Sequence, residues 1–153
     1  MRAHEAGALH GNDAAPTWLP YPSDVNTLID GLWSRTTRRT EDGAVEVGGV
    51  SVARIAEEVG TPAFVLDEDD FRHAFAEAFR PLAGADVYYA GKAFLCGAVA
   101  RWVEEDGLGL DVCTGGELAV ALRAGFPGER IALHGNNKSL AEIRRALEAG
   151  VGR

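Results

Sequence analysis

The 153-residue sequence has few cysteines, few lysines and no long apolar run. Because no apolar stretch approaches the roughly 20 residues that span a bilayer, a transmembrane helix is not expected. The N-terminus lacks the apolar core of a signal peptide, so export is not indicated. The two cysteines, Cys96 and Cys113, make neither a disulfide framework nor a metal cluster. These absences favour a protein of the reducing cytoplasm.

The charge balance narrows the possible partners. The net charge is −8 and the pI is near 4.9, so a nucleic acid or an anionic membrane surface is not expected as a partner. A composition with 46% hydrophobic and 25% charged residues is ordinary for a packed soluble protein. The length predicts a single domain.

Lysine is the scarce basic residue. Thirteen of the fifteen basic residues are arginine, and only Lys92 and Lys138 are lysine. Arginine keeps its proton in proteins, whereas a lysine amine can lose its proton and act as a nucleophile. The positions of the two lysines are therefore informative.

The first part of the chain differs from the rest. Residues 1–43 have little sustained periodicity, which predicts a mobile arm with one short helix near Val25 to Trp33. Residues 44–60 lead into the domain. They alternate and turn at Gly48-Gly49, which predicts a hairpin, and then show helical spacing up to Val59.

Residues 61–153 alternate short apolar runs with helical patterns. The expected strands are Ala63–Leu66, Val87–Ala90, Leu108–Cys113 and Ile131–Leu133. The strand starts at Val87, Gly109 and Ile131 are 22 residues apart, and these apolar runs do not alternate, as in strands buried on both faces of a parallel sheet. Capping boxes open two of the helices, at Thr114 to Glu117 and at Ser139 to Glu142.

This order predicts an α/β fold built as an incomplete TIM-type (β/α)8 barrel, with the first three or so βα units and an N-terminal arm. A barrel of this kind needs eight strands in about 250 residues. We therefore expect the chain to be the N-terminal piece of a longer protein.

Three candidate site residues lie at the ends of three successive strands. Lys92 follows the first strand of the regular series, and catalytic groups of α/β barrels gather at the carboxyl ends of strands. Partial burial would favour its neutral, nucleophilic amine. The alternative is a lysine that packs its stem and points its ammonium into water.

Asp111 lies in the next apolar strand, where a carboxylate needs a partner. It either orients a group in a site or caps a neighbouring turn. His134 follows the third strand and is either a site residue or a loop histidine with a satisfied hydrogen bond. Thr114 to Gly116 could bind an anion through backbone N–H groups, but a helix cap explains these residues as well.

The remaining candidates have simpler explanations. Lys138 precedes a capping serine and is expected in solvent, and Cys96 and Cys113 are expected as small buried residues. His4, His10 and His73 have no metal-ligand spacing, so no metal site is expected.

Three motifs carry a resemblance to a known family. The segment Val87-Tyr-Tyr-Ala-Gly-Lys-Ala-Phe94 resembles the lysine motif of the ornithine/diaminopimelate/arginine decarboxylases, which have the alanine-racemase-type barrel. Leu110-Asp-Val-Cys-Thr-Gly-Gly-Glu-Leu118 and Leu133-His-Gly-Asn-Asn-Lys-Ser139 match the next two units at the expected spacing. The His-Gly-Asn-Asn-Lys-Ser form is most like the diaminopimelate decarboxylases. The resemblance covers about residues 30–153.

The resemblance implies a pyridoxal 5′-phosphate (PLP) enzyme of the fold type III class, so residues 61–153 would be the N-terminal part of its PLP-binding barrel. It implies that Lys92 forms the internal aldimine, that Asp111 is an acidic residue near the cofactor, and that His134 lies near the cofactor. It further implies decarboxylation of meso-2,6-diaminopimelate to L-lysine and CO2 in lysine biosynthesis, by a cytoplasmic homodimer.

Other functions stay open. The family's ring-stacking histidine, glycine-rich phosphate site, Glu-Pro-Gly-Arg segment and catalytic cysteine come later in the chain, so neither cysteine here is assigned that role. The chain could be an inactive fragment or a non-catalytic PLP-binding paralogue. It could also belong to an ornithine or arginine decarboxylase of the same family.

Overall fold

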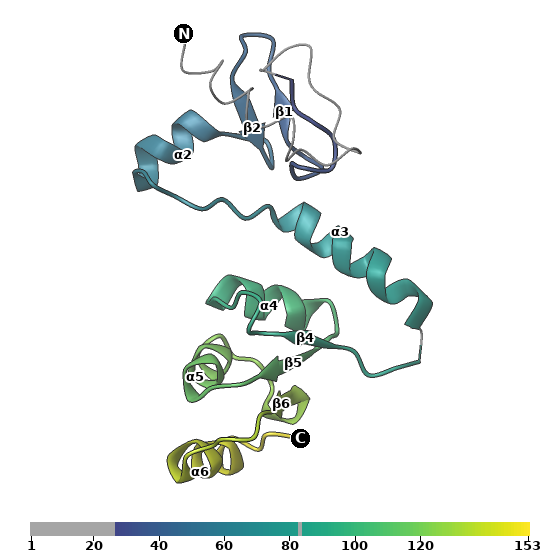
Figure 1. Ribbon diagram of the computed structural model, residues 1–153, viewed down its shortest axis with the longest axis vertical. Helices are drawn as coiled ribbons and strands as arrows, with labels where there is room; N and C mark the ends of the chain where they lie inside the picture. The colour runs from purple at the N-terminus through teal and green to yellow at the C-terminus, as the bar shows by residue number, and fades with distance from the viewer. Residues whose placement is uncertain (1–26, 83) are drawn as a thin grey trace, which may run out of the picture. The chain divides into compact units, whose positions relative to one another are not determined.

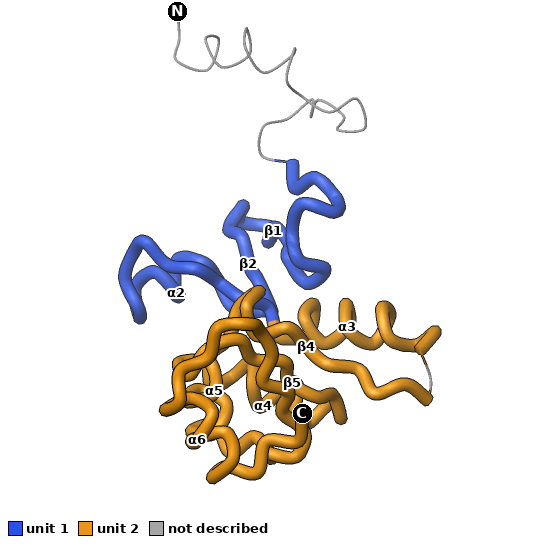
Figure 2. Tube along the Cα trace, turned by 60° about the horizontal axis from the view of Figure 1, so that its bottom comes forward, with its two compact units in different colours: residues 1–67 blue, residues 68–153 orange. Residues whose placement is uncertain are grey.

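The computed structural model describes residues 27–82 and 84–153 and divides the chain into two compact units. One unit comprises residues 1–67 and the other residues 68–153, coloured separately in Figure 2. The division falls a few residues beyond the expected boundary at residue 61. Most of the expected N-terminal arm, residues 1–26, lies outside the described residues.

The first unit contains a small antiparallel sheet followed by a helix. Strand β1 (Arg38–Arg39) pairs with β2 (Val45–Val47), which pairs with β3 (Val50–Ser51). The expected hairpin is confirmed, and both turn glycines have positive φ, 59° at Gly48 and 77° at Gly49. Helix α2 (Val52–Val59) follows, as the helical spacing predicts.

Two expected elements of this unit are wrong. Within the expected helix near Val25 to Trp33, the described residues from 27 onward form a turn, in which Leu32 N–H donates to the Ile29 carbonyl. Residues 63–66 are extended but pair with no strand among the described residues, and Phe64 is fully exposed. An apolar run makes a strand only when a neighbour satisfies its backbone groups.

The second unit repeats strand and helix. Its elements are α3 (Glu68–Phe79), η1 (Arg80–Leu82), β4 (Tyr88–Ala90), α4 (Gly97–Glu105), β5 (Gly109–Val112), α5 (Gly115–Arg123), η2 (Gly128–Arg130), β6 (Ile131–Leu133) and α6 (Leu140–Glu148). The three strands are parallel in the order β4-β5-β6. Helices α4, α5 and α6 follow one another in the same order (Figure 1). The predicted α/β class, with three βα units, is confirmed.

The core lies between this sheet and its helices. Tyr89, Leu110 and Ile131 stand in register across the three strands and are buried. Side chains alternate along a strand, so Asp111 faces away from its buried neighbours Leu110 and Val112. Burial of each large aliphatic side chain contributes about 2 kcal/mol, and this core fixes the register of the strand ends.

Helix α3 joins this core through aromatic rings. The rings of Phe71 and Phe75 lie 5.7 and 5.3 Å from the ring of Tyr89. These contacts hold α3 against the core. Arg72 forms ion pairs with Glu105 and Asp106, which hold the pKa of its guanidinium above the usual range. No helix in the described ranges is both long and apolar enough to span a membrane.

Candidate functional site

The three candidate residues lie at the carboxyl edge of the parallel sheet. The strand pairing continues past the assigned strands, because Gly91 N–H donates to the Asp111 carbonyl at 2.8 Å. His134 N–H likewise donates to the Val112 carbonyl at 2.9 Å. Lys92 follows Gly91 directly, so backbone bonds fix all three residues to one edge of the sheet.

Asp111 and His134 are in direct contact. The Nδ1 atom of His134 lies 3.1 Å from each carboxylate oxygen of Asp111. The side chain of Asp111 is mostly buried, whereas that of His134 is 56% exposed. Of the two alternatives for Asp111, the contact favours the one in which it orients a group. The carboxylate fixes one ring nitrogen of His134 and leaves Nε2 for another partner.

Lys92 lies at the same edge with its side chain exposed. Of the two alternatives for Lys92, its exposure agrees with the ammonium in water rather than with a partly buried amine. Within residues 27–82 and 84–153, no hydrogen bond or ion pair joins its ammonium to Asp111 or His134. Its backbone is closely confined, because a Cβ atom on Gly91 would lie 3.1 Å from the Asp111 carbonyl oxygen. The amine is thus accessible on a fixed backbone.

The helix that begins after Thr114 does not offer an anion site. Thr114 Oγ1 accepts from Glu117 N–H, but the Glu117 carboxylate accepts from Cys113 N–H, so this expected capping box is only half formed. Gly115 N–H donates to Glu142 Oε1 at 2.8 Å. A carboxylate of the protein thus already occupies this helix N-terminus.

Glu142 also completes the second expected capping box. The Ser139 hydroxyl accepts from Glu142 N–H, and the Glu142 carboxylate accepts from Ser139 N–H. The hydrogen bonds from Ser139, followed by the one from Gly115, lower the pKa of the Glu142 carboxyl. This side chain ties the loop after β6 to the start of α5.

Two expectations about neighbouring residues are wrong. Lys138 is not a solvated lysine, because its Nζ donates to the Cys113 carbonyl oxygen at 2.6 Å. Cys113 and Cys96 are free thiols of intermediate exposure rather than fully buried residues. The Sγ atom of Cys113 lies 3.4 Å from His134 Nδ1. Sequence reasoning missed this contact because the two residues lie on different strand ends.

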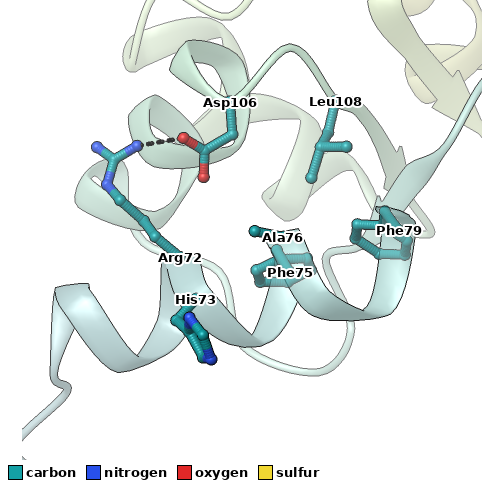
Figure 3. Close-up of a pocket in the computed structure, with 7 residues that line it drawn as sticks. All are labelled: Arg72, His73, Phe75, Ala76, Phe79, Asp106 and Leu108. Carbon is teal, nitrogen blue, oxygen red and sulfur yellow. Dashed lines mark hydrogen bonds and ion pairs between the residues drawn. The ribbon is translucent and has the colours of Figure 1, made fainter. Parts of the chain in front are cut away.

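A pocket of about 460 Å³ lies elsewhere in the second unit, between α3 and the residues before β5 (Figure 3). Its lining includes Arg72, Phe75, Phe79, Asp106 and Leu108. Asp106 and Leu108 precede β5, so the pocket lies near the amino end of that strand and contains none of the three candidate residues. The charged side chains of Arg72 and Asp106 in this pocket already form an ion pair with each other, drawn as a dashed line in Figure 3. We therefore expect the chemistry at the other edge of the sheet.

Comparisons with known proteins point to one family. The sequence profile described as "Pyridoxal-dependent decarboxylase, pyridoxal binding domain" matches residues 68–153. The chain is 50% identical over 157 aligned residues to a diaminopimelate decarboxylase of Mycobacterium leprae, covering 99% of this chain and 33% of that protein. It is 57% identical over 126 residues to the diaminopimelate decarboxylase of Mycobacterium bovis, covering 82% of this chain and 28% of that protein.

A solved structure is also similar. A diaminopimelate decarboxylase of M. jannaschii in complex with L-lysine superposes with a TM-score of 0.65 and 30% identity. The match covers 78% of this chain and 29% of that one. The chain thus spans about a third of the length of the curated relatives it matches.

Proposed function

The chain belongs to the pyridoxal-dependent decarboxylases, and we propose that the protein decarboxylates meso-2,6-diaminopimelate to L-lysine and CO2 with PLP as cofactor. The observation that carries this proposal is the position of Lys92, which follows β4 at the strand edge where Asp111 and His134 meet. The same edge is where α/β barrels gather their catalytic groups.

Lys92 is the residue that would hold the cofactor. Its exposed amine can reach an aldehyde, and its backbone is fixed by the bond from Gly91 N–H to the Asp111 carbonyl. The residues present therefore fit a carbonyl cofactor. Lys92 Nζ would bond covalently to the aldehyde carbon with release of water, as other catalytic lysines do.

Asp111 would hold the imidazole ring of His134 in place, and His134 would orient a bound molecule. With the Asp111 carboxylate accepting from Nδ1–H, the ring tautomer leaves Nε2 as an acceptor or proton carrier. His134 is exposed enough to meet a bound molecule, and Asp111 keeps the ring in place. When bound, PLP supplies an electron sink for the carbanion that forms as the α-carboxylate leaves.

The wider architecture belongs to the same proposal. Three parallel βα units with a common carboxyl edge are consistent with part of a (β/α)8 barrel of the fold type III class. The similarity to diaminopimelate decarboxylases supports both the barrel and the substrate. Three expectations stay predictions from the sequence. They are the arm at residues 1–43, the homodimeric assembly and the cytoplasmic location.

The test is a product assay. The purified protein, with PLP, is incubated with meso-2,6-diaminopimelate, ornithine or arginine, and CO2 and the amine products are measured. We expect L-lysine and CO2 from diaminopimelate, with no release in Lys92→Ala and release retained in Lys138→Ala. CO2 from ornithine or arginine instead would assign one of the related decarboxylases. PLP binding at Lys92 without CO2 from any of the three would identify an inactive fragment or a non-catalytic paralogue.

A further inference from the structure

One carboxylate joins the two loops that follow β5 and β6. The Oε1 atom of Glu142 accepts from Gly115 N–H at 2.8 Å, at the first residue of α5. Its Oε2 atom accepts from Ser139 N–H at 2.9 Å and from the Ser139 hydroxyl at 2.8 Å, at the N-cap of α6. Glu142 therefore uses each of its two oxygens for a different loop.

Only a carboxylate can make both sets of bonds. Both oxygens of a carboxylate accept hydrogen bonds, whereas a glutamine amide has one accepting oxygen and an NH₂ group that only donates. In Glu142→Gln, the NH₂ group would face the N–H of either Gly115 or Ser139, and two donors repel each other. One of the two loops would therefore lose its bond, although the side chain keeps its size.

Gly115 allows the close contact with Glu142. A Cβ atom at this position would lie 2.9 Å from Glu142 Cγ and 3.3 Å from its Oε1. Because Cγ is close to the α6 backbone, Glu142 would have to leave the Gly115 amide to make room. The neighbouring Gly116 is not restricted in this way, since its Cβ would lie 3.7 Å from Thr114 Oγ1. The two loops thus approach each other at a position that only glycine can occupy.

The two joined loops carry the contact between Asp111 and His134. Asp111 lies in β5, which leads to α5, and His134 follows β6 in the loop that leads to α6. His134 N–H donates to the Val112 carbonyl, which fixes this loop at its strand end. Glu142 fixes the loop at its helix end. Bonds at both ends therefore hold His134 Nδ1 at 3.1 Å from the Asp111 oxygens.

We propose that Glu142 is a positioning residue, which holds the two loops together and thereby keeps His134 Nδ1 against the Asp111 carboxylate. Lys138 also joins these loops, but its bond ends at the Cys113 carbonyl and leaves the first residue of α5 to Glu142. The importance of the contact for the reaction rests on the proposed function, whereas the contact itself can be measured without any reaction.

The test follows the contact between Asp111 and His134 with no cofactor added. NMR of the purified, isotope-labelled protein measures the chemical shift of His134 Nδ1, which reports the hydrogen bond of this atom to the carboxylate. Asp111→Asn removes the carboxylate and gives the reference shift. Glu142→Gln and Gly115→Ala break the connection from its two sides, and Gly116→Ala is the matched control.

We expect the Nδ1 resonance to move toward its Asp111→Asn position in Glu142→Gln and in Gly115→Ala, and to stay in place in Gly116→Ala. Because both variants break one connection, combining them should move the resonance no further than either alone. An unmoved resonance in Glu142→Gln would overturn the proposal, as would an equal movement in Gly116→Ala. If either variant is unfolded by circular dichroism, the other decides by the same criterion.

Catalysis gives a second readout, which separates positioning from stability. In a protein that releases CO2 from meso-2,6-diaminopimelate, Glu142→Gln should lower kcat about tenfold with KM little changed, measured well below the Tm of the variant. In the Asp111→Asn background, the same substitution should lower kcat by less than about twofold. Independent, multiplying losses would overturn the proposal. A parent protein that releases no CO2 would contradict the proposed function, and the NMR result would then decide this proposal alone.

Discussion

The carboxylate of Asp111 and the imidazole of His134 join the ends of two neighbouring strands, with His134 Nδ1 3.1 Å from each Asp111 oxygen. Their backbones are tied as well, because His134 N–H donates to the carbonyl of Val112, the residue after Asp111. The pair gives the carboxyl edge of the sheet a histidine of fixed orientation beside the backbone that carries Lys92.

Replacing Asp111 with Asn should leave the His134 imidazole without its fixed orientation. The amide keeps the size of the side chain but loses the negative charge that holds His134 Nδ1–H. We expect kcat for CO2 release to fall by roughly ten- to a hundredfold, because small misplacements of a site group have effects of that order. Covalent attachment at Lys92 should persist. Unchanged kcat would show that the pair is only structural.

Gly91→Ala should disturb Lys92 through the backbone. The new Cβ would lie 3.1 Å from the Asp111 carbonyl oxygen and 3.3 Å from Leu95 Cδ2, and the carbonyl belongs to a strand that cannot easily move. We expect PLP affinity to fall on the order of tenfold, measured by fluorescence titration. Gly97→Ala is the matched control, since its Cβ would lie 3.5 Å from Arg101. Equal affinities in the two variants would contradict this account.

The Glu142 carboxylate should make stability depend on acid pH. Its pKa is lowered from 4.5 by the bonds from Ser139 and Gly115, so its contribution is present above pH 4.5 and lost as pH falls through the lowered value. Glu142→Gln should lower Tm at pH 7 and approach the parent Tm under acid conditions. Thermal unfolding of both proteins at several pH values measures this difference. A gap between them that stays constant with pH would exclude the assigned role.

Leu110→Ala should test the core beneath the site. Leu110 is fully buried in the central strand, so the variant should lose about 2–5 kcal/mol of unfolding free energy, measured by urea denaturation. Leu32→Ala serves as control because Leu32 is 55% exposed, and its effect should stay within about 0.5 kcal/mol. Similar losses in the two variants would mean that the core lies elsewhere.

Much of the second unit could be predicted from local signals. The 22-residue spacing predicted strand starts at Val87, Gly109 and Ile131, and β5 and β6 begin at the last two while β4 begins one residue after Val87. Buried strands and helix caps depend mainly on nearby residues, which is why these elements were visible in the sequence. The order of the strands and helices also predicted that Lys92, Asp111 and His134 lie at one edge of the sheet.

Contacts between distant residues could not be predicted. Glu117 accepts from Cys113 rather than from Thr114, and Lys138 bonds to a carbonyl instead of facing water. The partner of each such hydrogen bond depends on which loops are neighbours in the folded chain. Local patterns in a single sequence do not show which loops these are. The strand expected at residues 63–66 failed for the same reason, because strand formation requires a partner.

The most direct measurement identifies the lysine that holds PLP. The PLP-loaded protein is reduced with borohydride, digested and examined by mass spectrometry, in parallel with Lys92→Ala and Lys138→Ala, which cover both lysines of the chain. The account predicts a pyridoxyl group on the peptide that contains Lys92, still present in Lys138→Ala and absent in Lys92→Ala. A label on Lys138, or bound PLP with no label on Lys92, would contradict it.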